Sequence, residues 1–415
     1  MINNFNIATD LKVELFLPDE ASNVFILGIS VLGSDDILAA VGSFVVGVSA
    51  IGGTDVLGES PDVAFAWQTV EAETTSAELE LGGDLENSLY FQPAPGRARI
   101  SMQSWTFDPN NNQNIRPGTR MRVRLDDGTI NQILFSGFID QVNASYYPGV
   151  YQPNVINITA LDSYRRLVNS RIADFDTTGL PAGYATPNEV LEAVTTATGF
   201  VLSTSSDVLD GKIPAEQVND RTAAGFINDA IQVGLGFVFI DPETAELVVK
   251  ARPTVTVTPP AGTYTIGNNH EDAYHLCMSD IEVVGDADTV FNSLYVALTS
   301  DAETNITVND QDSIDLYGYS SIDTTVNTTD TTELTRWANT VFAQSPTKLV
   351  KMVETPAIDR LGTLTEAAVF KPGELIGVKY QTTNIDIDDY YTVIKVGHSI
   401  DVDNWNTKLE LWKEF

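Results

Sequence analysis

Cysteine is almost absent from this chain of 415 residues, in which Cys277 stands alone. A disulfide within the chain is therefore excluded, and so is a zinc site built from several thiolates. Histidine is scarce as well, with three residues. His270 and His275 precede Cys277 in a His-x4-His-x-Cys pattern that matches no standard zinc spacing. We interpret this pattern as a chance arrangement, and we expect neither a metal site nor a cofactor.

Long apolar runs are also lacking. The most apolar stretch, residues 24–51, is interrupted by Asp35 and Asp36 and diluted by glycine and serine. Its uninterrupted parts are too short to span a bilayer, so we expect no stable membrane insertion. Residues 1–7 contain no cationic side chain and do not resemble a secretory signal.

Positive charge is sparse, because 23 Lys and Arg face 57 Asp and Glu, giving a formal charge of -34. Such a field repels phosphates and anionic lipids, which disfavours stable binding to nucleic acid or membrane but permits DNA to pass without sticking. Solubility alone is the alternative explanation. The 43% hydrophobic and 19% charged content is typical of a folded protein, and the length predicts two to four domains.

Arginines cluster in one segment of this acidic chain, although Lys12 is the only basic residue before the cluster. Alternation places Arg120, Arg122 and Arg124 on one face of a strand. Met121, Val123 and Leu125 lie on the opposite face. Arginine favours interfaces because its planar guanidinium pairs with carboxylates. The cluster therefore predicts an interface with an acidic neighbouring subunit, or internal pairing with Glu71, Glu73, Glu78 and Glu80. Its members are Arg97, Arg99, Arg116, Arg120, Arg122 and Arg124.

Two-residue periodicity predicts that most of the chain forms β-strands. The expected strands are residues 11–17, 24–32, 97–102, 121–125, 133–142, 154–160, 391–400 and 405–412, with a hairpin turn at Gly128 and a long loop over 42–58. In the last strand, Trp405, Thr407, Leu409 and Leu411 share one face.

Helix signals gather in the middle of the chain. Asp162 is placed to cap a helix over 163–171, and Thr186 to Glu189 form a capping box for a helix that Gly199 ends. A further helix over about 222–233 is followed by a hairpin of 237–240 and 247–250, and 253–262 reads as a linker. One more helix follows Asp330, among strands that fill the last third. The layout is β-rich, then small α/β, then β-rich.

No catalytic motif is present in the sequence. His398 lies within a strand-like run and is interpreted as a structural histidine rather than a general base. Asp386, Asp388 and Asp389 lack an EF-hand's glycine and final glutamate, so an acidic loop is preferred over a calcium site. Three tyrosines lie close together in the sequence and are interpreted as ordinary packing at a hairpin tip, with a carbohydrate platform as the alternative. They are Tyr146, Tyr147 and Tyr151.

Several short motifs occur in an order that resembles phage tail hub proteins. In the first half these are the turn at 115–118, the strand 121–125, Leu-Phe-Ser-Gly-Phe-Ile-Asp at 134–140, and the strand-to-helix joint at 156–167. In the second half they are 312–318, Pro-Gly-Glu at 372–374, and the closing hairpin 392–412. Two departures are Glu374, where aspartate is usual, and residues 18–75, which have no counterpart.

The resemblance implies a mainly β (α+β) fold with two tube-type β-barrel domains and a small α/β domain between them. The implied boundaries are 1–165, with the unplaced insertion near 18–75, then 166–288 with its linker, and 289–415. It further implies a structural virion protein and not an enzyme. Such a hub at the tail tip or baseplate continues and closes the tail tube, and attaches fibres or a spike during host attachment and DNA delivery.

The resemblance also implies the partners of the chain. They are copies of itself, most simply a trimer, the distal tail or tail tube protein, the tape measure protein, tail fibre or spike proteins, and DNA in transit without specific binding. Assembly would take place in the host cytoplasm. One alternative is a tail-tip adhesin that binds a host surface glycan or protein through residues 146–151 and 18–75. A cell-wall hydrolase with paired carboxylates is disfavoured because little length is unassigned.

Overall fold

The computed structural model describes eighteen segments of the chain. The expected strand 24–32, the loop 42–58, the turn at Gly128 and the linker 253–262 lie outside them. The described residues are 7–18, 65–70, 73–86, 89–105, 115–126, 131–146, 153–173, 175–176, 183–215, 217–218, 221–252, 263–268, 275–283, 291–343, 350–356, 370–384, 386–402 and 404–413.

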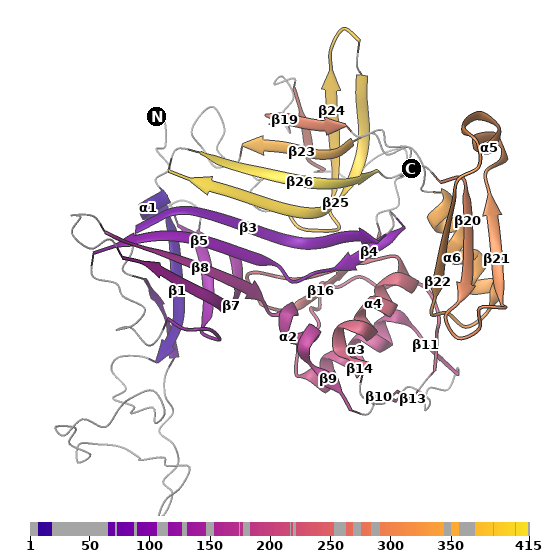
Figure 1. The fold of residues 1–415 in the computed structure, drawn as a ribbon, viewed down its shortest axis with the longest axis horizontal. Helices are drawn as coiled ribbons and strands as arrows, with labels where there is room; N and C mark the ends of the chain where they lie inside the picture. The colour runs from indigo at the N-terminus through magenta and orange to yellow at the C-terminus, as the bar shows by residue number, and fades with distance from the viewer. Residues whose placement is uncertain are drawn as a thin grey trace, which may run out of the picture.

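One sheet of fifteen strands dominates the molecule, which confirms the expected mainly β fold (Figure 1). Its path runs β18-β17-β24-β25-β3-β5-β8-β7-β6-β1-β2, with β4 added to β3, and with β26, β23 and β19 following from β25. The strands are β1 (Leu11–Pro18), β2 (Phe65–Thr69), β3 (Glu73–Glu86), β4 (Tyr90–Pro93), β5 (Arg97–Ser104), β6 (Arg120–Asp126), β7 (Asn131–Ser145), β8 (Asn154–Asp162), β17 (Thr265–Gly267), β18 (His275–Cys277), β19 (Asp280–Val283), β23 (Val350–Pro356), β24 (Leu375–Gln381), β25 (Asp386–Asp401) and β26 (Trp405–Lys413).

The N-terminal half of this sheet encloses its own hydrophobic core. Alternate residues of β1, β3, β5, β6, β7 and β8 point into it, among them Leu15, Ile100, Val123 and Ile158. The short helix α1 (Ile7–Asp10) contacts β3, and β1 also comes back into contact with β3. The expected strands in this region are confirmed, because alternation buries one face of each.

The C-terminal half has a second core between β17, β23, β24, β25 and β26. Leu409 is fully buried in it, together with Val353 and Val396. Trp405, Thr407 and Leu411 are buried on the same face of β26, as the alternation predicts. Trp412 points the other way and packs edge-on against Phe237, which ties this half to the helical body.

A single strand, β25, joins the two halves. Residues 386–392 pair with β24, whereas Lys395–Asp401 pair antiparallel with Ser76–Gly82 of β3. The other edge of β25 carries β26 from Tyr391 onward. Segments more than 300 residues apart in the sequence therefore form one continuous sheet.

A helical body packs below the sheet in the view of Figure 1. The capping box at Thr186 is present, Gly199 ends α3 in the left-handed conformation, and Thr222 caps α4. The first helix is shorter than expected, because it ends at Asn169 and Arg171 belongs to a strand. The elements are α2 (Tyr164–Asn169), α3 (Pro187–Thr198), α4 (Ala223–Gly234), the hairpin β15 (Phe237–Ile240) and β16 (Leu247–Lys250), and the short strands β9 (Arg171–Ile172), β10 (Phe175–Asp176), β11 (Tyr184–Ala185), β12 (Ile213–Pro214), β13 (Gln217–Val218) and β14 (Arg221–Thr222).

A three-stranded sheet and helix α6 pack against this body. They comprise β20 (Ser293–Leu298), β21 (Asn305–Asn309), α5 (Gln311–Tyr317), β22 (Ser321–Val326) and α6 (Thr331–Ala343). Trp337 of α6 donates a hydrogen bond from Nε1 to the carbonyl of Gln232 in α4 over 2.6 Å. Leu294 and Leu334 share one hydrophobic cluster with α3 and α4. The division of the chain at 165/166 and 288/289 stays a prediction.

Helix α6 begins as expected, because Asp330 accepts hydrogen bonds from the backbone N–H groups of Thr332 and Glu333. Helix α5 was not expected, and Asp310 caps it by accepting a hydrogen bond from Ser313 N–H. In the described part of the chain, no helix is long and apolar enough to cross a membrane.

Candidate assembly surfaces

Strand β6 carries three arginines on one face, as the alternation predicts. Met121, Val123 and Leu125 are fully buried on the opposite face. Strand β1 pairs with β6 and places Lys12 and Glu14 on the same face as the arginines. The arginine face is therefore an outer surface of the N-terminal half.

Glu14 is the anion that holds two of these arginines. Its Oε2 accepts from Arg122 Nε over 2.6 Å, and its Oε1 accepts from Arg124 Nη2 over 2.9 Å. The Glu14 side chain is only 5% exposed, so the pair of contacts lies at the edge of the core. Arg124 also lies 3.7 Å from Asp126.

Aromatic rings of the paired strands β1 and β2 extend this surface. The guanidinium of Arg122 lies 4.3 Å from the ring centre of Trp67, and that of Arg120 lies 5.0 Å from Phe16 and 5.8 Å from Trp67. Cations over aromatic faces are held by the ring quadrupole. Arg120 remains exposed to solvent above these rings.

Two further arginines pair across β3 and β5. Arg97 contacts Glu80 at 2.6 Å, and Arg99 contacts Glu78 at 3.6 Å between directly opposed residues. Internal pairing, one of the two expected alternatives, thus accounts for Arg97, Arg99, Arg122 and Arg124. Of the other expected partners, Glu71 lies outside the described residues, and Glu73 makes no ion pair within them.

Arg116 and Arg120 differ from the other four arginines. Both are exposed, and neither forms an ion pair within the described segments. Arg116 begins the turn in which its carbonyl accepts from Thr119 N–H over 3.1 Å. A role in a subunit interface stays a prediction for the cluster, and these two exposed side chains are the ones that no carboxylate pairs with among the described residues.

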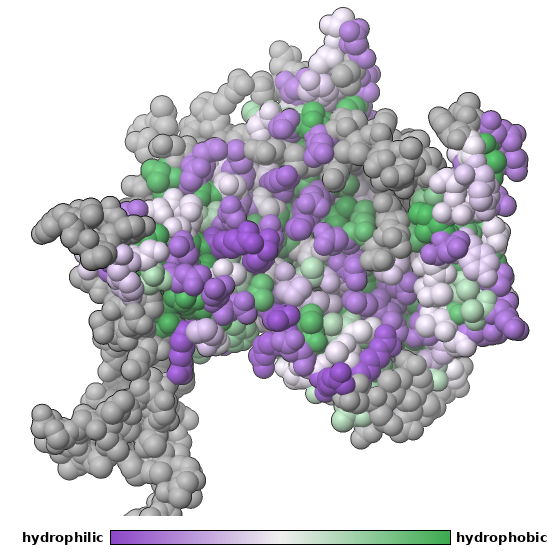
Figure 2. Space-filling view, viewed as in Figure 1, coloured by the Kyte–Doolittle hydropathy of each residue, from purple (hydrophilic) through white to green (hydrophobic). Residues whose placement is uncertain are grey.

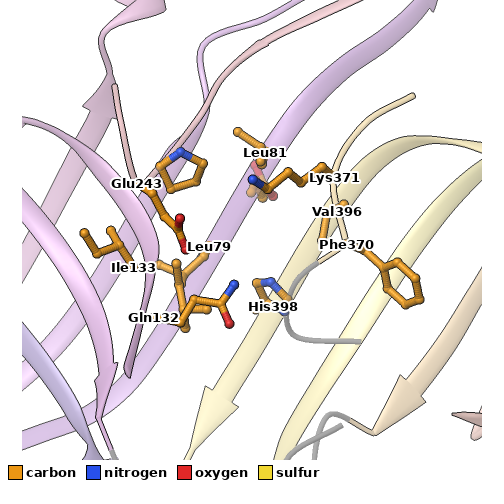
Figure 3. Close-up of a pocket in the computed structure, with 12 residues that line it drawn as sticks. Leu79, Leu81, Gln132, Ile133, Glu243, Phe370, Lys371, Val396 and His398 are labelled. Atoms are coloured by element: carbon orange, nitrogen blue, oxygen red, sulfur yellow. The ribbon is translucent and has the colours of Figure 1, made fainter. Parts of the chain in front are cut away.

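A small cavity lies where the two sheet halves meet the helical body (Figure 3). Gln132, Glu243 and His398 stand around it, with Leu79 of β3 and Val396 of β25 in its wall. Its volume is about 30 Å³, against the roughly 300–1,000 Å³ of pockets that hold small-molecule ligands. The cavity therefore has no room for a substrate.

His398 is packed in the sheet as a structural residue. It is 8% exposed, its Nδ1 lies 3.0 Å from Thr407 Oγ1, and the ring of Trp405 meets it edge-on. Burial lowers the pKa of His398 to about 4, because the interior disfavours the imidazolium. The ring is therefore neutral at physiological pH.

Asp162 is a second buried titratable group, at the joint between β8 and α2. Its carboxylate accepts from Tyr164 N–H over 2.9 Å and lies against Gly96. Burial raises the pKa of Asp162 to about 7, against the opposing effect of backbone hydrogen bonds from Gly96, Tyr164 and Arg165. It caps the first turn of α2, as its place before that helix predicts.

The acidic triplet lies on a strand, so the expectation of an acidic loop was wrong. Asp386, Asp388 and Asp389 belong to β25, where Asp386 accepts from Gln381 and Asp388 lies 3.5 Å from Lys379. Among the described residues, no group of three His, Cys, Asp or Glu side chains is arranged to hold a metal ion. His270 lies outside those residues.

Two exposed aromatic side chains stand at one end of the N-terminal half. Tyr146 is 45% exposed and Trp105 is 62% exposed. They follow β7 and β5, whose ends flank the start of β8. Tyr147 and Tyr151 lie outside the described residues. Trp105 was not anticipated, since a lone tryptophan after a strand carries no sequence signal of its own.

Comparison with solved structures places this fold among phage tail proteins. The tail protein from Neisseria meningitidis MC58 aligns with a TM-score of 0.57 at 15% identity, over 84% of this chain and 94% of that one. The 43 kDa tail protein of prophage MuSo2 from Shewanella oneidensis aligns with a TM-score of 0.55 at 13% identity, over 84% and 95%. No family model and no curated protein matches the sequence.

Proposed function

We propose that the chain is a structural subunit of a phage-type tail tip, the hub that continues and closes the tail tube. The observation that carries the proposal is the arrangement of two β-rich halves, joined through β3 and β25 beside an α/β body. The same fold extends over nearly the full length of two phage tail proteins. Fold alone does not assign function, so the role is a proposal that the following features support.

The surface chemistry suits assembly rather than catalysis. The cavity where the two sheet halves meet the helical body is only about 30 Å³, and burial keeps His398 neutral there. Sheet edges invite pairing with other chains, and a closed ring covers them. Three copies, each with two β-rich halves, would present six similar units to a hexameric tube.

The charge suits a conduit for DNA. A formal charge of -34 is compatible with a channel that repels phosphates, so that a passing genome does not adhere to it. The partners proposed for this role are the distal tail or tube protein, the tape measure protein and fibre or spike proteins, in the virion after assembly in the host cytoplasm.

Electron microscopy of the purified full-length chain tests the proposal. Closed rings with a central opening are expected, with a mass by light scattering of a small whole number of copies, most simply three. Antibody labelling of tails that contain the protein should decorate one end. A monomer at every concentration together with unlabelled tails would contradict the hub role.

A tail-tip adhesin is the second candidate, and the exposure of Trp105 and Tyr146 favours it. Aromatic faces near polar loops are suited to stacking on sugar rings. A glycan array probed with the wild type and with Trp105→Ala separates the two roles. Binding that depends on Trp105 supports the adhesin, whereas rings without glycan binding support the hub alone.

A further inference from the structure

The β24–β25 hairpin extends beyond the rest of the sheet. In Figure 1 it stands above the body of the molecule, and Figure 2 shows mainly hydrophilic side chains along it. Lys379 opposes Asp388, and Gln381 opposes Asp386 across its two strands. The base of the hairpin is part of the C-terminal core through Ile376 and Val378, whereas the residues near its tip, among them Gln381 and Asp386, are exposed. A strand pair that buries little apolar surface is marginal alone. A partner surface would therefore stabilise it.

One backbone edge of this hairpin is open. Residues 386–390 of β25 pair with β24 on one side. On the other side, pairing with β26 begins at Tyr391, and among the described segments no strand pairs with Asp386–Asp388. The backbone groups at such a strand edge can pair with another chain.

The exposed carboxylates on the hairpin favour a positively charged partner surface. Asp386 and Asp388 point to the same face because they are two residues apart in a strand. Both are exposed, and the Asp388 side chain, 56% exposed, has Lys379 as its neighbour at 3.5 Å. Because 23 Lys and Arg face 57 Asp and Glu in the chain, exposed positive side chains are scarce partners for these carboxylates.

The exposed arginines are the complementary surface. Arg116 and Arg120 are the two exposed members of the arginine cluster that form no ion pair among the described residues, and the guanidinium of Arg120 lies 5.0 Å from the ring centre of Phe16. Arg120 lies beside the C-terminal end of β1, because Met121 pairs with Leu15. In Figure 1, β1 lies at the left of the molecule and the β24–β25 hairpin at its upper right.

We propose that the β24–β25 hairpin of one copy docks on the Arg116–Arg120 surface of the next copy. The contact joins two different patches, so it is heterologous, and repetition of such a contact generates a ring when the rotation closes. The inference rests on the proposed hub function, because it names the surface through which the copies of the hub contact each other.

Charge exchange on the full-length chain tests the contact. Asp386→Arg with Asp388→Arg, and Arg116→Asp with Arg120→Asp, should each weaken self-association by about tenfold or more, since like charges then face each other. The four substitutions combined should restore it. Asp312→Arg with Asp315→Arg, exposed carboxylates on α5, is the matched control and should leave self-association unchanged.

Light scattering at low salt measures the mass of each variant, and thermal melting checks that each one folds. Rings that persist in both double variants, or a combined variant that stays dissociated, overturn this contact and leave the hub role intact. A wild type that never associates overturns both. As a second readout, Asp388→Cys with Arg120→Cys in a Cys277→Ser chain should form oxidised, covalently linked multimers, and their absence in assembled rings overturns the contact.

Discussion

Arg122 reaches from β6 to β1 and donates a hydrogen bond from Nε to Oε2 of Glu14 over 2.6 Å. Arg124 binds the other oxygen of the same carboxylate. We expect Glu14→Gln to lower the free energy of unfolding by about 3 kcal/mol, since two guanidinium groups then lose their shared anion at a mostly buried site. Urea unfolding of both proteins measures the difference.

The same substitution at Glu78 is the matched control. Arg99 and Glu78 also pair across strands, but their side chains are 54% and 62% exposed and 3.6 Å apart. Glu78→Gln should cost less than about 1 kcal/mol. Equal losses in the two variants would show that burial does not set the strength of the Glu14 pair.

Leu409 tests the core of the C-terminal half. It is fully buried and lies opposite Val353 of β23 and Val396 of β25. Leu409→Ala should lower the free energy of unfolding by about 2–5 kcal/mol because it leaves a cavity. The exposed neighbour Lys408→Ala should change it by less than about 0.5 kcal/mol. Similar unfolding midpoints for the two variants would contradict the assigned face of β26.

Alternation predicted strands well where one face is buried and the other is solvated, as in β5, β6, β8 and β26. Strand β3 was missed, although Ala77 and Leu79 alternate with Glu78 and Glu80 in it. Its two glycines, Gly82 and Gly83, and its acidic outer face resemble a loop. Its partner β25 lies more than 300 residues away, and pairing over that distance leaves no local signal.

Helices were predicted where capping chemistry is local. Thr186 with Glu189, and Asp330 with Glu333, satisfy the backbone groups of a first turn whatever surrounds them. Helix α5 was missed because its seven residues are too few for a clear apolar stripe. The end of α2 was placed too late, since the pairing of Arg171 with Thr222 in β14 decides it.

The arginine face of β6 could be predicted from the sequence, but its partners could not. Alternation alone placed Arg120, Arg122 and Arg124 on one face. Their partners Glu14 and Trp67 were not anticipated, because they reach the arginines through the pairing of β1 with β6 and β2. Strand order is set by tertiary contacts that a single sequence does not encode locally.

Gly137 shows why one motif residue must be glycine. A Cβ built there would lie 2.2 Å from the carbonyl oxygen of Leu161 in β8. Gly137→Ala should therefore lower the free energy of unfolding by about 1–3 kcal/mol through overpacking. At Gly397 the nearest atom is 3.7 Å away, so Gly397→Ala should be tolerated. A thermal shift of equal size in both variants would contradict this account.

Asp162 makes stability fall as pH rises. Its pKa is raised by burial to about 7 from 3.8, so the folded state holds a proton that the unfolded state has lost. This contribution is fully present below about pH 4 and is lost as pH rises through about 7. Asp162→Asn keeps an acceptor for Tyr164 N–H and should flatten this fall, as urea midpoints at several pH values measure. An unchanged slope would contradict the protonated buried carboxyl.

His398 acts in the opposite direction. Burial lowers the pKa of His398 to about 4 from 6.5. Between pH 6.5 and 4 the unfolded state therefore binds a proton that the folded state does not bind. The stability it contributes is fully present above pH 6.5 and is lost as pH falls toward 4, by about 3 kcal/mol at most.

His398→Gln removes the titrating group and should abolish that loss. Thr407→Val is the control, because it removes the hydroxyl 3.0 Å from Nδ1 but leaves the imidazole to titrate. Urea midpoints from pH 7.5 to 4.5 in an Asp162→Asn background isolate the effect. An acid-side loss of the same size in His398→Gln and Thr407→Val would show that His398 is not its source.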